Sequence, residues 1–182
     1  MLPVDLSMDF FSEESGSHGL RYAASKILAH QATRDFLKDN APHYTTITIH
    51  PTFVLGHSLI QSTAEELGGI NVMFWQSLMS EQPTIGNAWV DVHDVADAHV
   101  KCLETEIANG TEIILSAPPV SWESVANFVK DKYPMLGCKL QPPFDVNWTL
   151  DTTTANQVLG MKWRSWQSIV EDVVNQQLSL RK

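Results

Sequence analysis

The segment Tyr22-Ala23-Ala24-Ser25-Lys26 places a tyrosine and a lysine four residues apart at the start of an apolar run. In a helix this spacing puts both side chains on one face, so the ammonium of Lys26 can lie beneath the phenol of Tyr22. A cation in that position favours the phenolate form. The pair could therefore transfer protons, although the same spacing also occurs in ordinary solvated Tyr/Lys pairs.

Two later segments have the pattern of elements that would position this pair. Residues 45–56 alternate like a strand and break at Pro51 and Gly56, and residues 89–99 predict a short strand that runs into an Asp-capped helix. This order of elements predicts a parallel α/β core with a smaller C-terminal lobe. Helices are predicted over residues 20–39, 68–80, 95–104, 121–132 and 166–178, and strands over residues 44–50 and 112–117.

These three blocks, in this order, resemble the extended short-chain dehydrogenase/reductase family, which is related to NAD-dependent epimerases and dehydratases. The branch they resemble holds dihydroflavonol reductases, cinnamoyl-CoA reductases and fungal methylglyoxal or aldehyde reductases. The resemblance runs from about Phe11 to Lys182 and includes residues 159–163, before the last helix. It implies a partial Rossmann-like parallel sheet with a small C-terminal substrate lobe, in which strands 44–50 and 112–117 are neighbours.

Two parts of the family pattern are missing from the sequence. The family's Gly-rich turn, whose backbone N–H groups hold the cofactor pyrophosphate, has no counterpart. The paired glycines Gly68 and Gly69 follow no strand and predict a loop and a helix start. Ser12, Ser15 and Ser17 are too close to Tyr22 to match the family's catalytic serine. We therefore expect residues 1–182 to form a single domain that corresponds to the second half of such a reductase.

The resemblance implies an NAD(P)H-dependent reductase of a small or secondary-metabolite aldehyde or ketone. Tyr22 would donate a proton to the substrate carbonyl, and Lys26 would favour the phenolate and bind the nicotinamide ribose. Pro51 and the backbone as far as Val54 would flank the nicotinamide, with a plain strand terminator as the alternative for Pro51. The choice between NADP and NAD is made in the missing half.

Three histidines differ from the residues that are common at their positions in this family, and they allow a second hypothesis about function. His30, His50 and His93 stand where the family often has glutamate, asparagine or arginine, and arginine, respectively. We interpret each as a structural variant. Three histidines near one site would also suit a cofactor-independent isomerase, cyclase or dehydratase. An inactive remnant is the third alternative.

Composition narrows the classes of partner. A net charge of −9 and a pI near 5.1 argue against nucleic acids and anionic membranes. Neither a signal peptide nor a membrane-spanning run is evident, so we expect a cytoplasmic protein. Cys102, Cys138 and the scattered histidines match no metal-ligand or disulfide pattern. The open edge of a half-sheet predicts a homodimer or a partner chain.

Overall fold

The computed structural model describes residues 18–144 and 149–181. The chain divides into two compact units, Met1–Thr45 and Thr46–Lys182, which are described separately. Ser12, Ser15 and Ser17 lie outside the described residues, so the interpretation of these serines stays a prediction. The expectation of a single domain also stays a prediction.

The first unit contains helix α1 (His18–Asn40), which extends slightly beyond the helix predicted over residues 20–39. Its apolar residues include Ile27 and Phe36, whose side chains are 41% and 48% exposed. The helix ends at Asn40, and the next residue, Ala41, has a positive φ of 39°. Stability of α1 therefore does not come from burial of a continuous apolar face.

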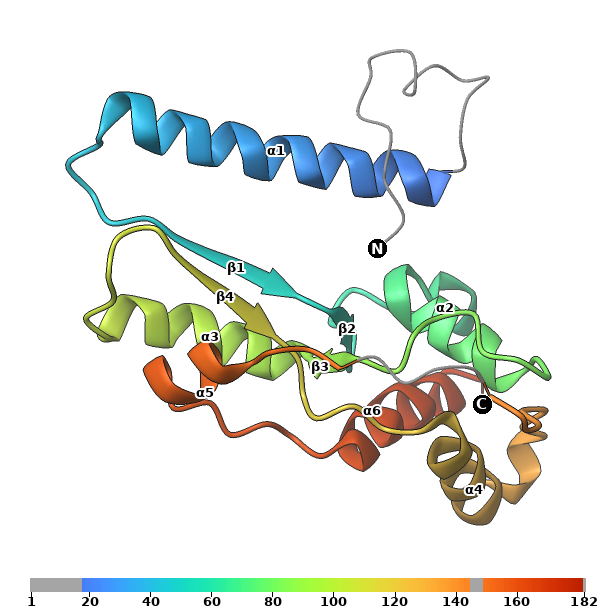
Figure 1. The fold of residues 1–182 in the computed structure, drawn as a ribbon. Helices are drawn as coiled ribbons and strands as arrows, with labels where there is room; N and C mark the ends of the chain where they lie inside the picture. The colour runs from blue at the N-terminus through green and yellow to red at the C-terminus, as the bar shows by residue number, and fades with distance from the viewer. Residues whose placement is uncertain (1–17, 145–148, 182) are drawn as a thin grey trace. The chain divides into compact units, whose positions relative to one another are not determined.

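The second unit contains two parallel strand pairs. Strand β1 (Ile47–Pro51) pairs with β4 (Thr111–Leu115), and β2 (Phe53–Leu55) pairs with β3 (Trp89–Asp91). Figure 1 shows β1 and β4 side by side, with β2 continuing from the end of β1. The parallel α/β class and the pairing of β1 with β4 are thus confirmed.

Helices surround these strands in an alternating order. Their bounds are α2 (Gly69–Leu78), α3 (Val92–Glu104), α4 (Trp122–Lys132), α5 (Thr153–Val158) and α6 (Trp166–Ser179), with short 3-10 helices η2 (Ala64–Glu66) and η3 (Pro134–Leu136). Side chains of Asp91, Ser121 and Ser165 cap α3, α4 and α6 by accepting backbone N–H bonds. The Asp-capped helix predicted from the sequence is present, but its cap is Asp91 and it begins at Val92 rather than at residue 95.

Two apolar clusters form the core of this unit. One face of β1 and β4 buries Ile113 and Leu115 against α3 and α5, and Ile47 and Ile49 pack on the same cluster. The other cluster joins α2, α4, α6 and the end of β2. At its centre the rings of Phe74, Trp89 and Trp122 lie with centroids 5.1–6.0 Å apart. Burial of such aromatic rings supplies much of the packing energy.

Several sequence predictions need correction. The first strand begins at Ile47 rather than at residue 44, β2 was not predicted as a strand, and α3 begins three residues before residue 95. Helix α5 was missed. Cys102 and Cys138 are free cysteines. No helix in the described ranges has the length and apolarity needed to cross a membrane.

Candidate functional site

The predicted proton-transfer pair lies in the first turns of α1. The ammonium of Lys26 lies 5.5 Å from the centroid of the Tyr22 ring, as the four-residue spacing requires. Ser25, between them, donates its hydroxyl to the Tyr22 carbonyl over 2.8 Å. The Tyr22 side chain is 60% exposed. A phenol with a neighbouring cation and open access can exchange a proton with a bound carbonyl compound.

Pro51 and Val54 lie in the second unit, where β1 passes into β2. Pro51 is level with Leu115 of β4, and Val54 is level with Val90 of β3. Thr52 connects the two strand pairs, because its backbone N–H and its hydroxyl both donate to the Leu115 carbonyl, over 3.0 and 3.2 Å. Pro51 is therefore the last residue of β1, and Val54 lies within β2. Tyr22 and Lys26 belong to the first unit, whereas Pro51 and Val54 belong to the second.

A pocket of about 230 Å³ opens at the carboxyl ends of β2 and β3. Ligands gather at this edge of a parallel sheet. Val54 is one of its lining residues, which also include Gly56, His57 and Asn71. Gly56, His57 and Asn71 could not be predicted as pocket residues, because no short motif joins the end of β2 to the start of α2.

Gly56 and Asn71 hold the pocket in shape. Gly56 N–H donates to Asn71 Oδ1 over 3.3 Å, and Asn71 Nδ2 donates to the Gly56 carbonyl over 2.7 Å. Gly56 has a φ of 140°, and a Cβ there would lie 2.8 Å from Cγ1 of Val92. Glycine is thus required both by the backbone conformation and by the close approach of α3. Gly68 caps α2, which confirms the loop and helix start predicted for the paired glycines.

A second pocket, of about 210 Å³, lies beyond the carboxyl end of β4. Ser116, Ala117, Asn156 and Trp163 are among its lining residues. Asn156 accepts the indole N–H of Trp163 over 2.9 Å, so the two side chains are held together across the pocket wall. The pocket has lining residues both from the end of β4 and from α5, a helix that was not predicted from the sequence.

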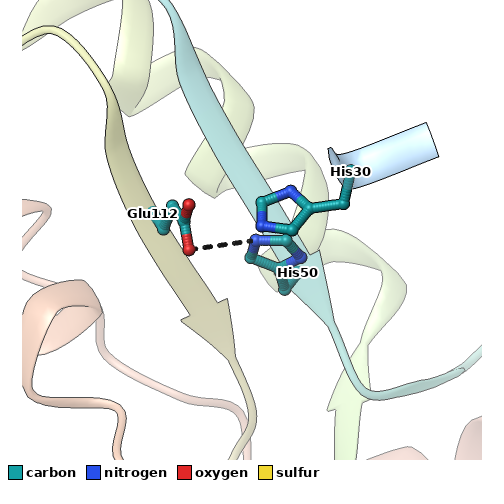
Figure 2. A group of neighbouring side chains, drawn as sticks. All are labelled: His30, His50 and Glu112. Carbon is teal, nitrogen blue, oxygen red and sulfur yellow. Dashed lines mark ion pairs between the residues drawn. The ribbon is translucent and has the colours of Figure 1, made fainter. Parts of the chain in front are cut away.

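The histidines that kept an acid/base function open have different partners. Figure 2 shows His50 and Glu112 reaching toward each other from β1 and β4, with His50 Nε2 4.0 Å from Glu112 Oε2. His93 Nδ1 lies 2.7 Å from Oδ1 of Asp91. His30 belongs to α1 in the other unit. Within the second unit, His50 and His93 therefore belong to separate pairs.

An ionic network that the sequence did not predict links α3 to the segment before α6. Asp94 is 1% exposed and accepts both the backbone N–H of Arg164, over 3.0 Å, and its guanidinium. The same Nη1 donates to Asp97 over 3.2 Å. A buried carboxylate needs such a partner, since an unpaired one would be strongly destabilising. Asp94 and Arg164 thus fasten the segment before α6 to α3.

No protein-family model matches the chain. It is 36% identical over 162 residues to ketoreductase sphI of Aspergillus fumigatus, covering 86% of this chain and 49% of that protein. It is 29% identical to ketoreductase azaE of Aspergillus niger, covering 91% and 53%.

Among solved structures, Gre2 from Candida albicans in complex with NADPH matches with a TM-score of 0.71 and 28% identity. The match covers 94% of this chain and 55% of Gre2. The chain spans about half the length of the curated relatives that it matches. With this fold and these relatives, the chain belongs to the extended short-chain dehydrogenase/reductase family, in the branch that holds fungal ketoreductases and Gre2.

Proposed function

We propose that this chain is the catalytic and substrate-binding part of an NADPH-dependent reductase of small or secondary-metabolite ketones and aldehydes. The Tyr22/Lys26 pair carries the proposal, because a tyrosine with a lysine ammonium 5.5 Å from its ring is a suitable proton donor. The 36% identity to a ketoreductase supports this interpretation. NADPH is favoured over NADH because the related Gre2 binds NADPH.

The reaction adds a hydride to the carbonyl carbon and a proton to the carbonyl oxygen. Bound NADPH would supply the hydride. Tyr22 Oη gives its proton to the carbonyl oxygen, so the double bond becomes an alcohol. The Lys26 ammonium stabilises the phenolate that remains until solvent returns the proton.

The residues proposed to bind the cofactor in this chain would contact its nicotinamide and the adjoining ribose. Lys26 has ammonium donors for ribose hydroxyls, and Pro51 and Val54 stand where a parallel sheet meets its ligands. Gly68 and Gly69 begin α2 directly after a 3-10 helix, which differs from a strand-turn-helix pyrophosphate cradle. We propose that the pyrophosphate is held by a part of the enzyme outside this sequence.

A complementation assay tests the function. The chain is mixed with the separately expressed N-terminal half of the Aspergillus fumigatus ketoreductase, and NADPH consumption is followed with methylglyoxal and with a larger aromatic ketone. Activity should require both halves. Tyr22→Phe should lower the rate by about 10²-fold or more. Tyr44→Phe is the matched control, because Tyr44 is also an exposed tyrosine, at 51%.

Two results would contradict the proposal. Equal activity of Tyr22→Phe and the unmodified chain would remove Tyr22 from the chemistry. NADPH-independent turnover of the ketone would favour the isomerase, cyclase or dehydratase alternative. Circular dichroism of both variants checks that helix α1 is retained.

A further inference from the structure

Three potential metal ligands from distant parts of the sequence meet beside the first turn of α3. Asp91 ends β3, His93 lies in α3, and Asp172 lies in α6. One ligand atom from each residue lies within 4.8 Å of the ligand atoms of the other two. No metal site was predicted from the sequence, because no two histidines and a nearby carboxylate have the spacing that zinc sites favour. The fold supplies the proximity that the sequence spacing lacks.

Asp91 contributes an oxygen that lacks a donor. Its side chain is 0% exposed. Oδ1 accepts the backbone N–H of His93 over 2.7 Å and contacts His93 Nδ1 over 2.7 Å. Oδ2 is buried and has no hydrogen-bond partner within residues 18–144 and 149–181. Buried carboxylate oxygens are normally paired, so an unpaired one indicates an absent partner.

The carboxylate of Asp172 lies close to Asp91 and His93. No hydrogen bond or ion pair to its carboxylate occurs among the described residues. Carboxylate oxygens of Asp91 and Asp172 lie within 4.8 Å of each other and of a His93 ring nitrogen, so their two negative charges repel across this space. A cation placed there would relieve this repulsion.

The cationic side chain nearby is already engaged. Arg164 Nε lies 4.0 Å from Asp91 Oδ1, while its Nη1 serves Asp94 and Asp97. One guanidinium thus faces three carboxylates, and Asp172 is a fourth acid beside them. The local charge is negative even with Arg164 in place, which favours uptake of a divalent ion.

We infer that Asp91, His93 and Asp172 form a binding site for one divalent transition-metal ion such as Zn²⁺. Two carboxylate oxygens and one imidazole nitrogen are ligand types that Zn²⁺ accepts, and a fourth position remains for water. Val92, which lies between Asp91 and His93 in the sequence, lines the pocket at the ends of β2 and β3. A bound ion would fasten α6 to the end of β3, beside this pocket. The inference does not depend on the proposed reductase function.

Calorimetric titration of the whole chain with ZnCl₂ tests the site. The unmodified chain should bind one equivalent. Asp172→Asn and His93→Gln should each weaken binding by at least about tenfold, the scale of damage at metal sites. His99→Gln is the matched control on the same helix, because His99 is exposed and bonds its own helix backbone at Val95. It should leave binding unchanged.

A second readout is thermal unfolding, which does not involve activity. Zn²⁺ should raise the melting temperature of the unmodified chain and of His99→Gln, but not of Asp172→Asn, because only a ligand bound to the native state stabilises it. Asp172→Asn relieves a repulsion, so this variant should fold. If it does not, His93→Gln decides the question, since the His93 side chain is 55% exposed.

The inference would be overturned by tight binding that survives in both Asp172→Asn and His93→Gln. It would also be overturned by binding that disappears in His50→Gln alone, because His50 and Glu112 offer a different imidazole and carboxylate pair. Absence of any Zn²⁺ binding by the folded chain would overturn it as well.

Discussion

Arg164 holds Asp94 through two different groups, its backbone N–H and its guanidinium. The two residues are 70 positions apart in the sequence, and Asp94 is fully buried. Lys101 adds a further link between α3 and the same segment by donating to the Leu159 carbonyl over 3.0 Å. The C-terminal segment is thus attached to α3 by polar contacts as well as by apolar packing.

We expect Arg164→Met to destabilise the fold by about 3 kcal/mol, near the lower end of the range for breaking a buried ion pair. The Asp94 carboxylate would lose its guanidinium partner while it stayed buried, and Arg164 itself is partly exposed, which moderates the loss. Urea unfolding measures the change. Asp97→Asn is the control, since Asp97 is 56% exposed, and this variant should cost less than about 1 kcal/mol. Equal losses in the two variants would contradict the assignment.

Gly56→Ala should destabilise the fold by about 1–3 kcal/mol through overpacking. The new Cβ would lie 2.8 Å from Cγ1 of Val92, and the φ of 140° is unfavourable for alanine. In a Gly56→Ala/Val92→Ala double variant, the clash disappears and the conformational strain remains. Thermal unfolding should therefore show partial recovery relative to Val92→Ala alone. A double variant that recovers nothing would assign the whole cost to the backbone.

Much of the fold follows from local patterns. The boundaries of α4 and α6 agree with the sequence because these helices begin after the capping residues Ser121 and Ser165. Strand β2 was missed because it has only three residues and closely follows Pro51. Helix α5 was missed because it is short and begins in a threonine run, whose residues have low helix propensity.

The contacts of the candidate site are likewise of two kinds, those within one helix and those between separate elements. The proximity of Lys26 to the Tyr22 ring could be predicted because their spacing is a property of one helix. The contact of Asn71 with Gly56 and the meeting of Asp91 with Asp172 join separate elements, so no spacing in the sequence indicates them. Pairings of this kind depend on how α2 and α6 pack onto the strands.

The chain alone should bind NADPH only weakly. A dinucleotide pyrophosphate is normally held by backbone N–H groups of a Gly-rich turn between a strand and a helix, and this sequence has no such turn. Calorimetric titration with NADPH should fail to reach saturation in the low-micromolar range. Addition of the relative's N-terminal half should tighten binding. Low-micromolar affinity of the isolated chain would mean that another segment holds the pyrophosphate.

Self-association is expected because of the short sheets. Within the described residues, β1 pairs only with β4 and β2 pairs only with β3, so each strand has one edge without a strand partner. Such edges favour pairing with another chain. Light scattering should give a mass that rises with protein concentration. A monodisperse monomer at every concentration would show that these edges are covered.

The last prediction separates the roles of the two residues on α1. Lys26→Met removes the ammonium near the Tyr22 ring and keeps a strong helix former, so α1 should persist. In the complementation assay, we expect it to lower the rate by about 10²-fold and also to raise the KM for NADPH, since Lys26 is proposed to bind the ribose. Tyr22→Phe should lower the rate without changing that KM. Lys38→Met, at the other end of the same helix, is the control and should change neither value. If Lys26→Met lowered the rate and left the KM for NADPH unchanged, Lys26 would act on the phenol alone, and the proposed ribose contact would be wrong.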